Sequence, residues 1–216
     1  MKISLLGPVG SGKGTQAQRV SHALNWARIS TGGLVRDQIE ADTELGRKLK
    51  RYTDRGEPVP DDVIMELTLP HLQPAGGWIL DDCPRTIDQA RTLDAELEKL
   101  GIGLDQVIML EGPTDEELIE RITSGRLHSL ATGMVYHVED DPPPDPHEGL
   151  DPGPFVERED DTEQAIQRQL EAYRKEAEAI KEHYDEQGIL AIVDAGQEVH
   201  KITEDILDVL GHPPKR

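Results

Sequence analysis

The chain has 216 residues, enough for one α/β core with a smaller inserted module. Hydrophobic residues make up 36% of the chain and aromatic residues only 3%, so the core must be mostly aliphatic. The formal net charge of −20 repels nucleic acids and anionic membrane surfaces, and we expect neither as a partner.

The first predicted elements are a strand, a glycine-rich loop and a helix. The apolar run Ile3–Leu6 precedes Gly-Pro-Val-Gly-Ser-Gly-Lys-Gly-Thr at residues 7–15, and helical spacing begins at Gln16. Glycines let successive N–H groups turn toward one anion, and the helix N-terminus adds partial positive charge. Lys13 supplies a full charge for the terminal phosphates, and the Thr15 hydroxyl can reach a phosphate-bound Mg²⁺. This context predicts a phosphate-binding loop, against the alternative of a glycine-rich turn without a ligand.

Three further helices are predicted before residue 70. Ser30 or Thr31 can cap a helix that continues to Glu40. A second helix is expected over residues 43–54. The third follows a proline-containing turn, and Asp61 is its expected N-cap.

Residues 78–89 hold a second group of candidate site residues. Apolar residues 78–80 predict a short buried parallel strand with Asp81 at its carboxyl end, where ligands lie in open α/β sheets. An aspartate there can orient water on Mg²⁺, although a strand-end turn residue is the plainer interpretation. Pro84 fixes the backbone before Arg85, which suits a guanidinium preset for forked phosphate contacts. Gln89 carries a carboxamide that can pair with the edge of adenine.

Helices and strands alternate in the second half of the chain. Thr114 and Glu117 form a Thr-x-x-Glu capping box at the start of one helix. This alternation predicts a parallel sheet with right-handed crossovers. The expected elements are helices over 87–100, 114–122, 162–187 and 199–210, and strands over 106–110 and 190–193.

Residues 125–161 break this alternation. Between Glu139 and Asp161 there are six prolines and ten acidic residues, and Arg158 is the only lysine or arginine. A segment of this length without a periodic helix needs a functional reason. Its position between two predicted helices is that of an inserted lid.

Three motifs in this order resemble the adenylate kinase family of nucleoside monophosphate kinases. They are the loop with Gly14 between Lys13 and Thr15, the Ser-Thr-Gly of residues 30–32 followed by Arg36, and the Asp-x-x-Pro-Arg of residues 81–85. The resemblance implies an α/β P-loop three-layer fold with a central parallel five-stranded sheet. It also implies a core domain (1–30, 60–123 and 161–216), a small helical AMP-binding module (31–59) and a lid (124–160) that excludes water from the reaction.

The activity that the resemblance implies is Mg²⁺-dependent transfer of the ATP γ-phosphoryl group to AMP, giving two ADP. The implied catalytic residues are Lys13, Arg85, Arg126 and Arg158. The implied ATP-binding residues are Gly10, Ser11, Gly12, Lys13, Gly14, Thr15, Arg121, Arg126, Val135, Tyr136 and Gln197. The implied AMP-binding residues are Thr31, Arg36, Glu57, Pro58, Val59, Asp82, Cys83, Pro84, Arg85, Gln89, Arg158 and Gln169.

Two details of this assignment concern the metal and the adenine of ATP. Thr15 and Asp81 would serve Mg²⁺ through water, and we expect no zinc because the lid contains no cysteine. The resemblance implies that Arg121 lies over the ATP adenine. The alternative for Arg121 is an ordinary i,i+4 partner of Glu117.

The chain departs from the family pattern in two places. Asp82 and Cys83 stand where the family usually has Gly-Phe, which alters the affinity and base selectivity expected of the AMP site. At the lid, Gly125 and Gln169 stand where the family usually has arginines. A one-residue shift of the alignment with the family pattern puts Arg126 at the first of these positions. We therefore predict that Arg126 is the entrance catalytic arginine and that the position of Gln169 is weakened.

Two other functions stay open from the sequence, namely a kinase for another nucleoside monophosphate and a nucleotide-binding regulator with weakened catalysis.

The single cysteine suits a reducing compartment and excludes an intrachain disulfide. No apolar run approaches the roughly 20 residues of a membrane span, and Met1-Lys2 leads directly into a predicted strand. We expect a cytoplasmic monomer, whose acidic excess fits either a salt-adapted host or an ordinary solvated surface.

Overall fold

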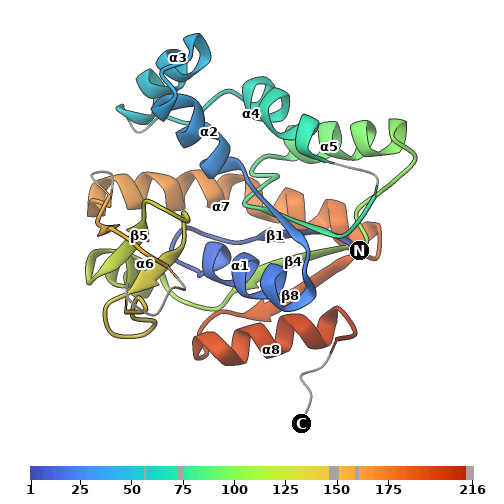
Figure 1. The fold of residues 1–216 in the computed structure, drawn as a ribbon. Helices are drawn as coiled ribbons and strands as arrows, with labels where there is room; N and C mark the ends of the chain where they lie inside the picture. The colour runs from blue at the N-terminus through green and yellow to red at the C-terminus, as the bar shows by residue number, and fades with distance from the viewer. Residues whose placement is uncertain (56, 73–74, 146–150, 159–160, 213–216) are drawn as a thin grey trace.

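The fold is that of a computed structural model, which describes residues 1–55, 57–72, 75–145, 151–158 and 161–212. Five parallel strands form its central sheet in the order β2-β3-β1-β4-β8, which confirms the expected sheet (Figure 1). The strands are β1 (Lys2–Leu6), β2 (Ala27–Ser30), β3 (Trp78–Asp81), β4 (Gln106–Glu111) and β8 (Leu190–Asp194).

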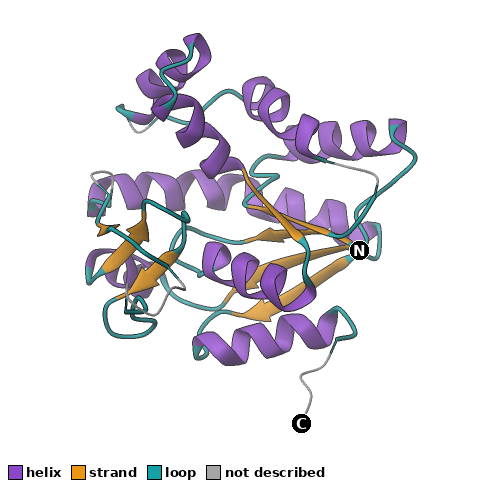
Figure 2. Ribbon diagram, in the orientation of Figure 1, coloured by secondary structure: helices purple, strands orange, loops and turns teal. Residues whose placement is uncertain are grey.

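Helices cover both faces of this sheet and make the three layers (Figure 2). On one face, α1 (Lys13–Leu24) and α8 (Val199–Val209) contribute Val20 and Ile206 to a cluster with Ile108 of the sheet. On the other face, α5 (Ile87–Lys99) and α7 (Glu163–Glu186) pack on β4 through a second cluster. The helix α6 (Asp115–Thr123) packs against α7, and the predicted capping box at its start is confirmed.

A helical unit stands above the carboxyl edge of the sheet in Figure 1. It consists of α2 (Thr31–Glu40) and α3 (Glu44–Thr53), followed by α4 (Asp61–Thr68) and the short 3-10 helix η1 (Leu69–His71). The Ser30 side chain caps α2, which selects Ser30 from the two predicted caps, Ser30 and Thr31. The N-cap predicted for α4 is wrong, because Pro60 occupies that position and the Asp61 carboxylate instead accepts hydrogen bonds from Thr86 and Gln89.

The segment that we expected to form a lid contains a small antiparallel sheet, which the residue pattern did not predict. Its strands are β5 (Arg126–Ser129), β6 (Val135–His137) and β7 (Phe155–Val156), in the order β6-β5-β7. The buried Asp151 carboxylate joins parts of this segment, because it accepts hydrogen bonds from the hydroxyls of Ser129 (2.7 Å), Thr132 (2.6 Å) and Tyr136 (3.0 Å).

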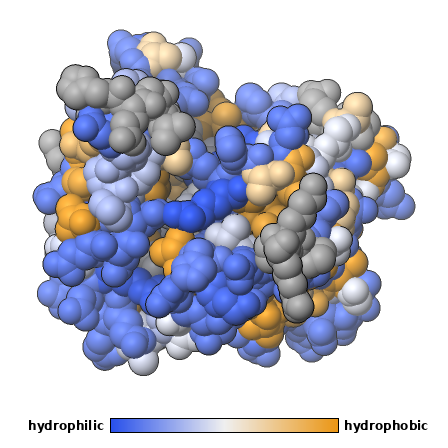
Figure 3. Space-filling view, turned by 60° about the horizontal axis from the view of Figure 1, so that its bottom comes forward, coloured by the Kyte–Doolittle hydropathy of each residue, from blue (hydrophilic) through white to orange (hydrophobic). Residues whose placement is uncertain are grey.

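Most of the surface is hydrophilic, as the high content of charged residues requires. Figure 3 shows a face on which hydrophilic side chains predominate and hydrophobic ones are scattered among them. Within the described ranges, the structure holds no helix that is both long enough and apolar enough to cross a bilayer.

Candidate active site

The glycine-rich loop connects β1 to α1 at the carboxyl edge of the sheet. Gly10 and Gly12 have positive φ angles of 84° and 87°, and a Cβ at Gly10 would lie 2.7 Å from the Leu118 carbonyl oxygen. Only glycine fits there without displacing the backbone of α6. Because Gly12 caps α1 without a side chain, the first N–H groups of that helix are left for a ligand. The Ser11 hydroxyl is buried and has no hydrogen-bond partner among the described residues.

Lys13 lies inside this loop rather than in solvent. Its side chain is 9% exposed, and its Nζ donates a 2.8 Å hydrogen bond to the Pro8 carbonyl. The same Nζ lies 3.5 Å from Oδ1 of Asp82. Burial lowers the pKa of Lys13, while the Asp82 carboxylate opposes that shift. The ammonium group is therefore held at the mouth of the loop by one carbonyl and one carboxylate.

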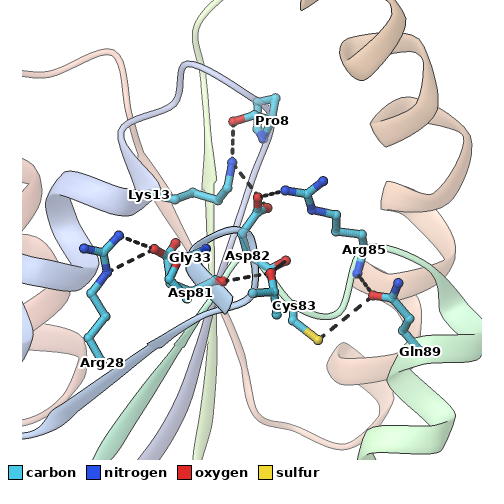
Figure 4. Close-up of polar contacts among 11 residues, drawn as sticks. Pro8, Lys13, Arg28, Gly33, Asp81, Asp82, Cys83, Arg85 and Gln89 are labelled. Carbon is cyan, nitrogen blue, oxygen red and sulfur yellow. Dashed lines mark hydrogen bonds and ion pairs between the residues drawn. The ribbon is translucent and has the colours of Figure 1, made fainter. Parts of the chain in front are cut away.

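Asp81 ends β3 in register with Leu5 of β1 and Ser30 of β2, which places it beside the loop. Its Oδ2 accepts hydrogen bonds from Nε (3.1 Å) and Nη2 (2.6 Å) of Arg28, a residue that the sequence interpretation missed. A Cβ at Gly14 would lie 3.3 Å from Arg28 Nη2 and 3.9 Å from Asp81 Oδ2. The Arg28–Asp81 pair therefore lies against the first turn of α1 (Figure 4).

The oxygen atoms of Asp81 and Thr15 suit a magnesium ion that keeps its bound water molecules. Mg²⁺ prefers oxygen ligands and is usually bound by one or two carboxylates together with substrate phosphates. Asp81 supplies such a carboxylate, and Thr15 lies on the first turn of α1, against which the carboxylate packs. Arg28 shares Oδ2 of Asp81, so the carboxylate has one oxygen outside this pair.

Asp82 follows β3 with a left-handed backbone, at a φ of 67°. Its carboxylate lies between two cations, because Oδ2 pairs with Nη2 of Arg85 while Oδ1 faces Lys13 (Figure 4). Burial disfavours its ionised form, but Arg85 and Lys13 outweigh that effect and hold the pKa of Asp82 below its ordinary value. The expected effect of Asp82 on base selectivity stays a prediction, and the structure adds that its carboxylate contacts the side chains of Lys13 and Arg85.

The remaining residues after β3 form a hydrogen-bonded cluster. Oε1 of Gln89 accepts from the Arg85 backbone N–H at 2.7 Å, and Nε2 donates to Asp61 at 2.7 Å. Cys83 is fully buried, with a pKa raised to about 12 by burial, and Pro84 follows it through a cis peptide bond. The Thr31 hydroxyl lies 3.3 Å from the Asp82 carbonyl oxygen. Gln89 thus has both ends of its carboxamide bonded to protein in this conformation.

Other predicted AMP-site residues lie on the helical unit. Nη1 of Arg36 would be 3.2 Å from a Cβ at Gly32, which shows that the arginine folds back over the first turn of α2. Glu57 and Pro58 are exposed and Val59 is half-buried, between α3 and α4.

On the predicted ATP side, Arg121 and Gln197 come together at the loop after β8. Nη1 of Arg121 donates a 2.9 Å hydrogen bond to the Ala195 carbonyl, while the Gln197 amide contacts Asp194 and Asp205. Arg121 is thus bound to this loop, and the Glu117 carboxylate is used in the capping box.

The two lid residues predicted to contact ATP point in different directions. Cγ2 of Val135 would lie 3.7 Å from a Cβ at Gly14, so this residue faces the glycine-rich loop. The ring of Tyr136 instead packs edge-on against Phe155 inside the lid. The Tyr136 side chain is therefore used inside this segment, where its hydroxyl also donates to Asp151.

The lid arginines gather around Asp161 and His128. Arg126 makes a two-point ion pair with Asp161, and its Nε–Oδ2 distance is 2.9 Å. Arg158 lines a cavity of about 50 Å³ together with Gly125, Arg126 and Asp161. His128 is 5% exposed, and burial together with Arg158, Arg126 and Arg36 lowers its pKa to about 2. These contacts bring the predicted residues Arg36, Arg126 and Arg158 to one place.

Gln169 is not brought into this cluster. It lies on an exposed part of α7, and the described part of the chain offers its side chain no hydrogen bond. Its neighbour Arg168 is exposed as well. Neither residue supplies a charge to the site in this conformation.

Comparison with known proteins gives consistent results over nearly the whole chain. A family model described as adenylate kinase matches residues 5–189. The adenylate kinase of Caldicellulosiruptor bescii is 37% identical, with 98% of this chain and 99% of the relative aligned. The adenylate kinases of Methanothrix thermoacetophila (97% and 98% aligned) and Staphylococcus aureus strain Mu50 (98% and 100%) are also 37% identical.

Proposed function

The chain belongs to the adenylate kinase family, and from this premise we propose how its residues share the family's reaction. That reaction is the reversible transfer of the γ-phosphoryl group of ATP to AMP, giving two ADP. The observation that carries the assignment is the convergence of Lys13, from the glycine-rich loop, and Arg85, from the segment after β3, on one anionic group. A cation for the donor phosphate and a cation for the acceptor phosphate thus meet at the edge of the sheet.

The glycine-rich loop is the proposed donor site. Gly10, Ser11, Gly12 and Gly14 would present backbone N–H groups to the β- and γ-phosphates, and Lys13 would neutralise their charge. Arg121 and Gln197, which meet at the loop after β8, would flank the adenine of ATP. Val135 would cover the phosphates from the lid.

The acceptor site is proposed between α2 and the segment after β3. Arg36 and Arg85 would hold the AMP phosphate, since a guanidinium gives forked contacts to phosphate oxygens. Thr31 and Gln89 would contact the base, and residues 57–59 and 82–84 would line the pocket. Gln89 keeps one N–H donor and one oxygen lone pair beyond its contacts with Asp61 and Arg85, and these would be the groups it offers to adenine.

Magnesium is the proposed cofactor, bound with ATP. Thr15 and Asp81 would hold it through water. When bound, the ion neutralises charge on the phosphates and aligns them for in-line transfer. Arg28 pairs with the Asp81 carboxylate and keeps a positive charge beside the first turn of α1.

We assign the lid to residues 124–160, the AMP-binding module to 31–59, and the core to 1–30, 60–123 and 161–216. The separate antiparallel sheet of β5, β6 and β7 supports the first boundary. Arg126 and Arg158 would contact the moving phosphoryl group, while the lid excludes water and so favours transfer over hydrolysis. The buried thiol of Cys83 agrees with a reducing, cytoplasmic location, and we propose a monomer.

A coupled assay of ADP formation tests this function. ATP and Mg²⁺ are supplied with AMP, CMP, UMP or GMP as the acceptor, at equal concentrations. We expect AMP to be preferred by at least about tenfold, because a site that hydrogen-bonds one base discriminates strongly against a base that leaves its polar groups unpaired. A preference for another acceptor would identify a different nucleoside monophosphate kinase. Binding of nucleotides without turnover would indicate a regulator.

A further inference from the structure

Asp82 is the one acidic residue that contacts both Lys13 and Arg85 in the described part of the chain. Its backbone is held on two sides, since its N–H donates to the Leu5 carbonyl at 3.1 Å and its carbonyl accepts from Thr31 at 3.3 Å. Its left-handed φ of 67° aims the side chain out of the sheet edge. This conformation is uncommon for residues other than glycine, and aspartate and asparagine adopt it more readily than most.

The contacts of Asp82 are those that a phosphate would make. One carboxylate oxygen faces the Lys13 ammonium at 3.5 Å, and the other pairs with the Arg85 guanidinium. Carboxylates and phosphates bind these cations through the same charge-assisted hydrogen bonds. The side chain of Asp82 is 26% exposed, so it is within reach of a ligand that enters from solvent.

We propose that Asp82 is a built-in competitor of the substrate phosphates, which occupies their contacts on Lys13 and Arg85 until a nucleotide displaces it. The proposal rests on the proposed function only in taking these two cations as phosphate ligands. Each incoming phosphate must break an existing ion pair and then lies near a displaced negative charge, which weakens binding.

This role predicts an effect on the phosphate and none on the base. Asp82→Asn removes the charge with little change of shape, and asparagine tolerates the left-handed conformation. Asp82→Gly removes the side chain and any backbone strain. Asp208→Asn, at an exposed position on α8, changes the net charge by the same amount far from the site and serves as the matched control.

The experiment is isothermal titration calorimetry of AMP, ATP and adenosine with the wild type and the three variants, each nucleotide alone so that no turnover occurs. We expect both Asp82 variants to bind AMP and ATP about tenfold more tightly than the wild type. Adenosine, which has no phosphate, should bind equally to all four proteins, and Asp208→Asn should match the wild type. Thermal melting of each variant checks that it is folded.

Unchanged affinity for AMP and ATP in both folded Asp82 variants would overturn the proposal. An equal change for adenosine would also overturn it, because it would locate the effect in the base pocket. The proposed function fails independently, if the wild type forms no ADP from ATP and AMP. In that case tighter AMP and ATP binding by the Asp82 variants would still support the competitor role.

Discussion

The carboxyl edge of the central sheet and the lid both hold cationic side chains in ion pairs, lysine and arginine at the sheet edge and arginine in the lid, but they position those pairs by different means. At the sheet edge, Asp81 and Asp82 follow a buried strand whose register with β1 and β2 fixes their backbone. In the lid, Arg126 on a four-residue strand pairs with Asp161, which lies 35 positions later. The backbone that carries Asp81 and Asp82 is therefore fixed by the central sheet, whereas the pairing of Arg126 depends on a side-chain contact with a residue outside the antiparallel sheet.

This difference suggests that the sheet edge and the lid contribute to the reaction in different ways. A site fixed by a sheet edge keeps its backbone in place when side chains exchange their partners for phosphates, and a preorganised backbone favours electrostatic catalysis. A lid that is held by side-chain ion pairs and one buried carboxylate can exchange those partners for the phosphates of a nucleotide. We therefore expect substitutions at the sheet edge to have the largest effect on turnover, and substitutions in the lid to have smaller effects that depend on conditions.

The largest effect is expected for Lys13→Met. Methionine fills the buried stem of the side chain but gives no charge to the phosphates, so turnover should fall by about 10²–10³-fold, the usual cost of losing one donor to the transition state. The coupled assay gives the rate, and circular dichroism with thermal melting confirms the fold. Turnover close to that of the wild type in a folded variant would remove the glycine-rich loop from the mechanism.

Arg126→Ala should have the next largest effect. We expect turnover to fall by about 10–100-fold, less than for Lys13, because Arg126 must leave Asp161 before it can contact a phosphate. Arg168→Ala is the matched control, since Arg168 is exposed on α7 and should stay within about twofold of the wild type. If Arg126→Ala has no effect, the shifted alignment at the lid entrance is wrong.

A pH experiment probes the polar packing of the lid through His128. The native ring stays neutral down to about pH 2, whereas the unfolded chain takes up a proton near pH 6.5, so His128 destabilises the fold as the pH falls below 6.5. Between pH 6.5 and 5.5 this linkage amounts to about 1 kcal/mol. Urea unfolding should therefore show less acid sensitivity in His128→Phe than in the wild type.

The exposed histidine His22 on α1 supplies the control for this measurement. His22→Phe should keep the pH dependence of the wild type. Equal pH dependence in the wild type and in His128→Phe would show that the lid does not hold a neutral, buried imidazole.

The smallest effect is expected for Gln169→Arg. An arginine at this position of α7 adds a cation where we predict that the site is weakened, and we expect turnover to rise or the KM for AMP to fall by about two- to fivefold. Gln167→Arg, on an exposed neighbouring position of α7, adds the same charge and should leave both constants unchanged. A gain of equal size in both variants would point to a general charge effect.

Features that depend on neighbouring residues were predicted well. The glycine-rich loop, the strand before Asp81, the capping box at α6 and the long helix α7 are encoded by short patterns of glycine, apolar and capping residues. Their position at one sheet edge then followed from the general geometry of parallel sheets. The fifth strand, β2, was not located by its residues, because it is a four-residue edge strand with partly exposed side chains.

Features that depend on distant contacts were missed. Arg28 could not be connected with Asp81 because the two lie on different strands, and the two-residue strand β7 pairs with β5 across a long segment of the chain. The contacts of the Asp82 carboxylate were also not predicted, since only the folded chain shows that Lys13 lies on its other side. Arg28 lies two residues before Ser30, in the strand that leads to Thr31. Because side chains alternate between the two faces of a strand, Arg28 and Ser30 share one face, and this alternation is the signal that could have identified Arg28.

The most direct test of the whole account is phosphorus NMR of one sample that contains the protein, Mg²⁺, ATP and AMP. If the sheet edge binds both phosphates and the lid excludes water, the ATP and AMP signals should fall together, and ADP alone should appear until equilibrium is reached. A second sample that starts from ADP should reach the same mixture. Growth of inorganic phosphate while AMP stays constant would show transfer to water and would contradict the account.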